Sequence, residues 1–149
     1  MPTTTATTST ATTTTLGRSL LTLVALSTSV SCYLADWNET HVKNPRWPPH
    51  ARFHNGQTMS MGLCLGTLTA YYTWRMTPNA AAEKDSLTTA ALIGTLYWVT
   101  GMSAILYPGT KWEDPEFGER SPQKAVFGTH VVLCWIGWWL EMRRLRRLS

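Results

Sequence analysis

The run Ser86–Thr110, SLTTAALIGTLYWVTGMSAILYPGT, contains no charged side chain and ends next to a Pro-Gly pair. A helix needs about 20 largely apolar residues, with a range of roughly 17 to 25, to cross the hydrocarbon core of a bilayer. This run is therefore long enough to span a membrane by itself. It indicates a membrane protein although the 149-residue chain as a whole is only 44% hydrophobic.

Three more runs lack charged residues: Ser19–Ala35, Gln57–Trp74 and Ala125–Leu140. Each is close to the shortest length that can cross a bilayer as a helix, but four such runs in one chain favour four spans. The sequence therefore predicts an all-α fold, a four-helix transmembrane bundle. The expected spans are about residues 18–36, 50–75, 86–107 and 123–142.

The chain before the first span is a threonine-rich segment without charged or aromatic residues. Such a composition cannot bury enough apolar surface to offset chain entropy, so residues 1–16 are expected to be a disordered tail and residues 17–149 the transmembrane domain. Arg18 followed by the apolar segment Leu20–Val30 also fits a secretory signal peptide. A retained helix is favoured because the apolar run continues up to Trp37, a typical interface anchor.

The polar stretch Asp36–Gly56, DWNETHVKNPRWPPHARFHNG, separates the first two expected spans and holds three of the four histidines. Proline fits the first turn of a helix without losing a hydrogen bond, so Pro48 and Pro49 predict that the second helix begins there. That start places His50 and His54 on one helix face, since residues four apart lie above one another.

Two histidines at this spacing can bind one metal ion, and a third ligand from a nearby histidine or carboxylate would suit zinc or non-haem iron. The motif lacks the internal glutamate of the metalloprotease signature, and such histidines are more often hydrogen-bonded or interfacial. No metal or other cofactor is therefore favoured, and His50 and His54 are the ligands expected if zinc or iron is bound.

The same stretch offers acid–base chemistry without a metal, because imidazole and carboxyl groups can move protons at near-neutral pH. The alternative is that these charged groups pair in water, where an exposed pair contributes only about 0–1 kcal/mol. Candidates for catalysis are His50, His54, His130, Asp36, Glu39 and His41. Candidates for substrate binding are Trp47, Arg52 and Asn55, with Arg52 expected to bind an oxyanion.

His130 is the one ionisable side chain within the fourth apolar run. An ionisable residue at membrane depth is a functional candidate by default, because its desolvation has a cost that packing alone does not return. The alternative is a neutral histidine that is hydrogen-bonded to a neighbouring helix.

With four spans, the first and third loops lie on the same side of the membrane, so the histidine-rich and carboxylate-rich loops can meet. The arginine cluster Arg143–Arg147 next to the last span favours a cytosolic C-terminus and resembles arginine-based endoplasmic-reticulum retrieval signals. Tryptophan and tyrosine residues near the span ends, Trp112 among them, are expected to anchor the helices at the interface.

Several function classes are not indicated. The three cysteines fall in three different apolar runs without CxxC spacing, so neither a disulfide framework nor a zinc ribbon is expected. The sequence contains no GxGxxG, P-loop or GxSxG motif, which argues against nucleotide use and an esterase mechanism. The net charge of +4 is explained by the C-terminal arginines, and no nucleic-acid partner is expected.

The run Asn44–Gln57, NPRWPPHARFHNGQ, preceded by Asp36, Asn38 and His41, resembles a family of small fungal four-span membrane proteins of unknown function. In size and layout the chain is also similar to the emopamil-binding sterol isomerase group, in which carboxylates and histidine inside a helix bundle shift double bonds. It is likewise similar to the fungal anthrone oxygenases, small membrane proteins that oxidise polyketides. Neither motif matches residue by residue, so no catalytic role is transferred from these groups.

The leading hypothesis is an integral membrane enzyme of secondary metabolism that acts on a lipophilic terpenoid or polyketide-derived intermediate by isomerisation, cyclisation or dehydration. One alternative is an oxygenase, with a metal or without any cofactor. Another is a non-enzymatic protein that binds lipids or acts as a scaffold. The expected partners are a lipophilic small molecule and membrane lipids, and the sequence leaves homo-oligomerisation open.

Overall fold

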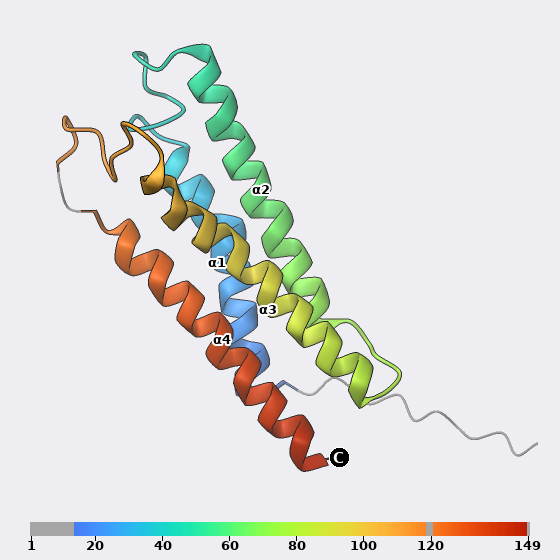
Figure 1. Cartoon of the computed structure of the whole chain (residues 1–149). Helices are drawn as coiled ribbons and strands as arrows, with labels where there is room; N and C mark the ends of the chain where they lie inside the picture. The colour runs from blue at the N-terminus through green and yellow to red at the C-terminus, as the bar shows by residue number, and fades with distance from the viewer. Residues whose placement is uncertain (1–13, 119–120, 149) are drawn as a thin grey trace, which may run out of the picture.

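The computed structural model describes residues 14–118 and 121–148, which form four long helices (Figure 1). A short 3-10 helix, η1, continues the third of them. The predicted disordered tail falls mostly on residues 1–13, outside the described residues. The elements are α1 Leu16–Asp36, α2 Pro49–Trp74, α3 Ala80–Ser103, η1 Ala104–Leu106 and α4 Gln123–Leu148.

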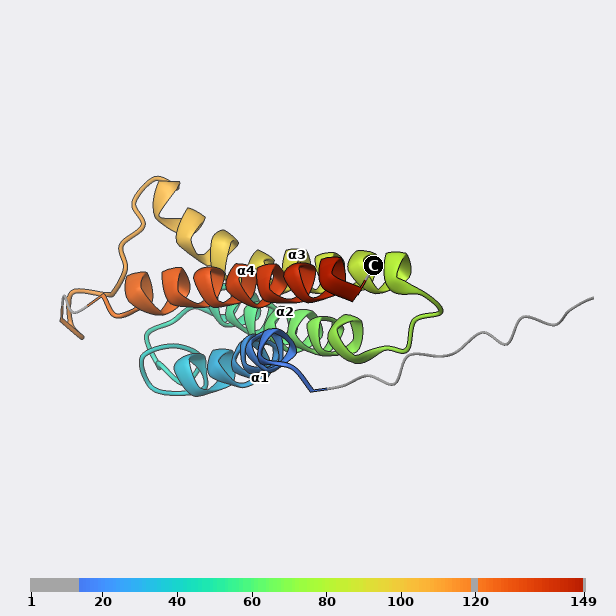
Figure 2. The same cartoon turned by 90° about the horizontal axis from the view of Figure 1, so that it is seen from below.

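The four helices pack side by side as a bundle, as the all-α prediction required (Figures 1 and 2). α1 packs against α2 and α4, and α3 packs against the same two helices. The connections α1–α2 and α3–α4 lie at one end, here called the long-loop end, and the α2–α3 turn lies at the other end with the start of α1 and the C-terminus. The first and third loops meet at the long-loop end, where Arg46 forms an ion pair with Glu116.

Among the described residues, three helices are long and apolar enough to cross a membrane: α1, α3 with η1, and α4. α2 is as long as α4, at 26 residues, but does not reach the same hydropathy. Its sequence is rich in Ser, Thr, Gly and Tyr, and its first two turns carry His50, Arg52, His54 and Asn55. The prediction of four apolar spans is therefore confirmed for three helices by composition.

Glycine lets α2 approach α1 closely. A Cβ atom added at Gly62 would lie 2.7 Å from Cys32 Sγ, and one added at Gly66 would lie 2.5 Å from the Ala25 carbonyl oxygen. These are closer than side-chain atoms tolerate, so the predicted small-xxx-small contact between Gly62 and Gly66 and a neighbouring helix is confirmed.

Gly66→Ala is expected to lower the melting temperature of the detergent-solubilised protein, because the added methyl group overlaps the α1 backbone and overpacking costs about 1–3 kcal/mol. Gly56→Ala is the matched control in the same helix, since nothing lies within 4 Å of its added Cβ. Replacing glycine by alanine within a helix stabilises it by roughly 0.5–1 kcal/mol, so this variant should melt at the same or a higher temperature. Equal melting temperatures for Gly66→Ala and the wild type would contradict the close α1–α2 contact.

A buried charge network ties the helices together at the end opposite the long loops. Arg18 of α1 donates to Glu83 of α3 at 2.8 Å, and Arg144 of α4 donates to Glu141 at 2.8 Å and also contacts Glu83. Arg18, Glu83 and Glu141 are all buried. The Arg18 guanidinium also donates to the Thr73 carbonyl of α2, so the network contacts all four helices.

Two helix boundaries differ from the sequence prediction. α3 begins at Ala80 and not near residue 86, because the Asn79 side chain caps the helix by accepting from the Ala82 N–H at 2.9 Å, and alanines follow it. α4 continues to Leu148, so the C-terminal arginines belong to the helix. Within it, Arg143 lies over the Trp139 ring, 4.5 Å from its centroid.

Candidate functional site

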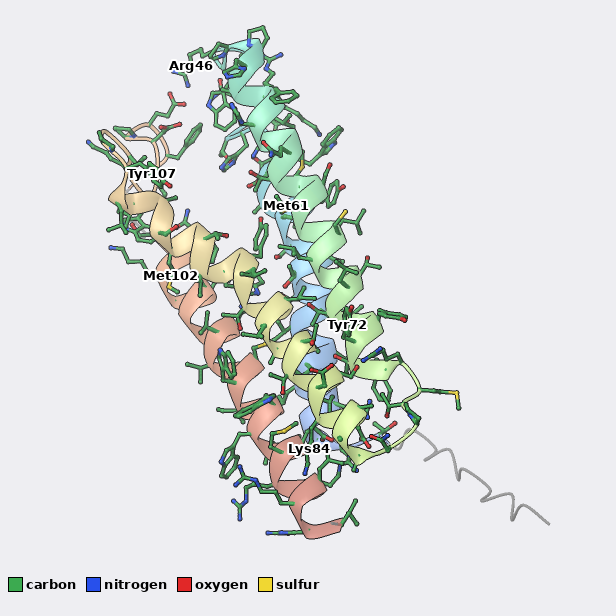
Figure 3. All side chains as sticks on the ribbon, turned by 45° about the vertical axis from the view of Figure 1, so that its right-hand side comes forward. Arg46, Met61, Tyr72, Lys84, Met102 and Tyr107 are labelled. Carbon is green, nitrogen blue, oxygen red and sulfur yellow. The ribbon has the colours of Figure 1, made fainter. Side chains whose placement is uncertain are left out.

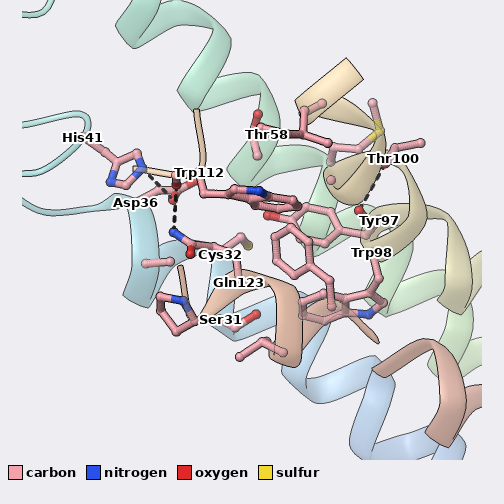
Figure 4. A pocket seen from close by; sticks show the side chains of 18 of the residues that line it. Ser31, Cys32, Asp36, His41, Thr58, Tyr97, Trp98, Thr100, Trp112 and Gln123 are labelled. Carbon is pink, nitrogen blue, oxygen red and sulfur yellow. Dashed lines mark hydrogen bonds and ion pairs between the residues drawn. The ribbon is translucent and has the colours of Figure 1, made fainter. Parts of the chain in front are cut away.

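A cavity of about 690 Å³ lies inside the bundle near the long-loop end (Figure 4). Its walls come from the end of α1, the middle of α2, the end of α3 with η1, the third loop and the start of α4. Most of the lining is apolar or aromatic. The ionisable side chains among the lining residues include Asp36, His41, Tyr97 and Lys111.

The polar part of the cavity wall is a pair formed by Asp36 at the end of α1 and His41 in the first loop. His41 Nε2 lies 3.7 Å from Asp36 Oδ1, and the other carboxylate oxygen, Oδ2, accepts a hydrogen bond from the Asn55 amide at 3.0 Å. Asn55 is buried beside the pair. The carboxylate is therefore fixed from α2 while it faces the imidazole.

The hydrogen bonds around His41 determine where its ring carries a proton. The Thr40 hydroxyl donates to the Asn38 side-chain oxygen at 2.6 Å and lies 2.7 Å from His41 Nδ1. A hydroxyl that donates elsewhere can only accept from the imidazole, so the proton is assigned to Nδ1. Nε2, the other ring nitrogen, is the one that faces Asp36.

Aromatic rings form the apolar part of the cavity. Figure 4 draws Tyr97 and Trp98 on the side away from His41 and Asp36, with the Trp112 ring close to them. Trp98 is buried and packs against Phe127 with ring centroids 5.6 Å apart. Trp112, expected from sequence to be an interface anchor, instead lines the cavity, and its backbone carbonyl accepts from Gln123 at 3.1 Å.

His130 lies directly behind this aromatic wall. Its ring stacks on Trp98 with centroids 4.0 Å apart, while Nδ1 lies 2.7 Å from the Val126 carbonyl and Nε2 lies 2.7 Å from the Ser27 hydroxyl. Because a carbonyl only accepts, Nδ1 carries a proton, and both ring nitrogens have partners. His130 thus supports Trp98 and links α4 to α1, and it is outside the set of residues that line the cavity.

His50 and His54 lie on one face of α2, with their Nε2 atoms 3.0 Å apart, as their spacing predicted. Both side chains are exposed and neither lines the cavity. Within residues 14–118 and 121–148, no group of three or more His, Cys, Asp or Glu side chains could hold a metal ion. Among these residues, the histidine pair has no third ligand for the zinc or iron considered above.

The structure places the remaining sequence candidates around the first loop. Trp47 packs edge-on against His41 with ring centroids 5.4 Å apart, and it is not among the residues that line the cavity. Arg52 donates to the Asn44 carbonyl at 2.7 Å and so holds the first loop against α2. Glu39 is exposed.

A comparison with protein families finds one match, a family of unknown function designated DUF6640, over residues 20–149. The match covers α2, α3 and α4 and all but the first four residues of α1. The chain belongs to the DUF6640 family. No curated protein and no solved structure matches it.

In this DUF6640 protein, sequence reasoning selected Asp36, His41 and Asn55 but missed the aromatic residues that complete the site. Tyr97 and Trp98 lie within the longest charge-free run, where their side chains look like ordinary lipid-facing or core residues. Residues three and four positions apart share a helix face, and the set of Tyr97, Thr100, Gly101 and Ala104 follows that spacing along one side of α3 and into η1. This periodicity was the available signal for a shared surface.

The cavity of the DUF6640 protein combines three chemical features in one space. It has an acid–base pair on one wall, a phenol from Tyr97, and an apolar volume within the range of about 300–1,000 Å³ that is typical of small-molecule sites. Such a space suits a lipophilic molecule with one polar group.

Proposed function

We propose that the DUF6640 protein is an integral membrane enzyme that transfers protons on a lipophilic substrate bound in this cavity. The observation that supports it most is the His41–Asp36 pair, with Nε2 and Oδ1 3.7 Å apart, on the wall of a largely apolar cavity. A general acid or base must reach the substrate directly, and His41 and Asp36 both line the cavity.

The proposed topology has four spans, including α2. Its 26 residues extend over about 39 Å at helical rise, which exceeds the hydrocarbon thickness. α2 runs along α1 over most of that helix, from the Gly62–Cys32 contact to the hydrogen bond from Trp74 Nε1 to the Thr22 hydroxyl at 2.8 Å. If α1 and α3 cross a membrane, α2 must lie in the same layer.

The arginine-rich end of α4 supports a cytosolic C-terminus and a location in the endoplasmic-reticulum membrane. Arg144 is neutralised by Glu83 and Glu141, whereas Arg143 and Arg147 are exposed. The cavity would then lie near the lumenal side of the membrane.

The proposed chemistry needs no redox partner. His41 Nε2 takes a proton from a carbon or hydroxyl of the substrate, and Asp36 stabilises the imidazolium that forms. After exchange with solvent, His41 delivers a proton to a different carbon of the substrate, which gives an isomerisation, and protonation of a double bond or a hydroxyl would lead to cyclisation or dehydration. Tyr97, across the cavity, is positioned to donate a hydrogen bond to a developing oxyanion.

Isotope labelling tests this function. Membranes that contain the wild-type protein, the His41→Ala variant or no DUF6640 protein are incubated with a lipophilic extract of the natural source in D₂O, and the extracts are compared by mass spectrometry. The expected result is a product that contains solvent deuterium and forms only with the wild type. A product that carries ¹⁸O from ¹⁸O₂ would indicate an oxygenase instead, and identical extracts in all three samples would indicate a binding or scaffolding protein.

A further inference from the structure

α3 leaves α2 at the long-loop end of the bundle. In the other half of the bundle the two helices are in contact, with the Ser86 hydroxyl donating to the Tyr72 carbonyl at 2.7 Å and a Cβ added at Gly94 lying 3.1 Å from Thr69. Towards the long loops, Figure 3 shows α3 diverging from α2, so that Met102 and Tyr107 lie far from the labelled residues of α2. There Gly101 of α3 contacts α4, because a Cβ added at Gly101 would lie 2.7 Å from the Phe127 ring.

The cavity extends into the space between the diverging helices. Thr58 and Met61 of α2 line it from one side, and Ala104 and Ile105 of η1 line it from the other. All four residues are exposed, with Met61 48% and Ile105 36% exposed. Lining residues that are also exposed mark places where a cavity is open, so this cavity has an opening on the side between α2 and α3.

The polarity of the cavity changes along the axis of the bundle. Asn55 and its partner Asp36 lie at the outer part, where α1 ends. Met61 is six positions after Asn55 on α2, or about 9 Å deeper in the bundle at helical rise. In a membrane, the Asp36–His41 pair would therefore lie near the headgroup level, while the side opening lies next to the acyl chains.

We propose that the DUF6640 cavity takes a lipophilic alcohol, whose hydroxyl binds at Asp36 and His41 and whose tail passes between α2 and α3 into the bilayer. This inference rests on the proposed function for the identity of the site and adds the substrate class and the entry route. A hydroxyl donates to the Asp36 carboxylate, whereas a carboxylate or phosphate headgroup would be repelled by it. The only lysine in the lining, Lys111, is exposed on the third loop, so water screens its charge.

The route also fits the size of the site. A cavity of about 690 Å³ holds the reacting part of one molecule, and the side opening leaves the rest of a long chain in lipid. A substrate that already lies in the bilayer then enters without crossing water.

Photolabelling tests the inference. The purified full-length protein in phosphatidylcholine nanodiscs is incubated with hexadecanol that carries a diazirine near its hydroxyl end and a terminal alkyne. Labelled peptides are mapped by mass spectrometry. The expected labels lie on α1 around Cys32–Asp36 and on α3 around Tyr97–Gly101, they are competed by unmodified hexadecanol, and they are weaker with the matching hexadecanoic acid probe.

Variants at the opening test whether the alcohol probe enters the cavity there or only contacts the lipid-facing surface. Met61→Trp and Ile105→Trp, on opposite sides of the opening, are each expected to reduce cavity labelling about tenfold, equivalent to about 1.4 kcal/mol of binding free energy. Leu68→Trp is the matched control, because Leu68 lies two turns further along the same face of α2, is 44% exposed and is outside the cavity lining. It should label as the wild type does. Melting temperatures of all three variants verify that the bundle is intact.

Three results would overturn the inference: equal labelling of Met61→Trp, Ile105→Trp and Leu68→Trp, labels confined to lipid-facing positions, or stronger labelling by the acid than by the alcohol. The proposed function fails separately. If His41→Ala keeps full turnover while Met61→Trp blocks labelling, the site binds lipophilic alcohols as inferred but does not use His41 for catalysis. If His41→Ala loses turnover and Met61→Trp labels normally, the function stands and the entry route is wrong.

Discussion

Glu141→Leu is expected to lower the free energy of unfolding by about 3–5 kcal/mol, the usual cost of breaking a buried ion pair by removing one partner. Glu141 is only 1% exposed and accepts from Arg144 Nε at 2.8 Å and from the Thr15 hydroxyl. The oxygen that accepts from Arg144, Oε2, also lies 4.0 Å from Arg18 Nε, and that guanidinium is buried too. Without the carboxylate, two arginines would share the single charge of Glu83. The measurement is urea- or heat-induced unfolding in detergent, followed by tryptophan fluorescence.

The double variant Glu141→Leu/Arg144→Leu removes one charge of each sign and leaves the Arg18–Glu83 pair intact. It should recover a large part of the lost stability, because the uncompensated buried charge is then gone. Asp85→Leu is the control, since Asp85 is exposed on the same end of α3 and should change stability little. A single Glu141→Leu variant as stable as the wild type would show that the network does not hold the bundle together.

His41→Ala is expected to reduce turnover by about 10²–10⁴-fold, the usual contribution of a positioned acid–base group. In the proposed function, Nε2, which faces Asp36, is the nitrogen that exchanges the proton with substrate. Binding of the lipophilic substrate should change far less, because the aromatic walls remain. Asp36→Asn keeps the shape of the site but removes the charge that stabilises the imidazolium, so it should also lower turnover. Rates are measured with the isolated substrate in nanodiscs.

If His50 and His54 were the catalytic residues, as the sequence suggested, their alanine variants would lose turnover and His41→Ala would not. The same assay therefore decides between the two sets of histidines. Both residues are exposed on α2 and lie outside the cavity lining. Loss of turnover in His50→Ala and His54→Ala, together with full turnover in His41→Ala, would contradict the placement of the site in the cavity.

The helices and their neighbours were largely predictable because they depend on local signals. Charge-free runs marked the helices, Pro48 and Pro49 marked the start of α2, and the alternating direction of successive helices brought the first and third loops to one end. The spacing of Gly62 and Gly66 also predicted a close helix contact, which is found between α2 and α1.

The charge network could not be predicted because its members are far apart in the chain. Arg18 looked like the positive flank of an apolar segment, and Arg144 looked like part of a solvated basic tail. The fold brings Arg18 and Arg144 to Glu83 and Glu141. The four charges form a neutral cluster at one end of the bundle. Pairing across 61 or 65 residues has no local sequence signal.

Only part of the site could be predicted, because some of its contacts join residues that are far apart in the chain. Asp36, His41 and Asn55 stand out as polar residues at the edge of apolar runs, and they lie together. Which histidines reach the cavity depends on the path of the first loop, which turns His41 inward and leaves His50 and His54 on the outer face of α2. That path is set by contacts such as the one from Arg52 to the Asn44 carbonyl, which spacing alone does not reveal.

The most direct test of the account is a structure of the wild-type protein purified with its natural lipophilic ligand retained. Ligand density is expected inside the bundle, between the His41–Asp36 pair and the rings of Tyr97 and Trp98. A polar ligand atom should lie within hydrogen-bonding distance of His41 Nε2. Density on the outer face of α2 beside His50 and His54, with the cavity free of ligand, would contradict it.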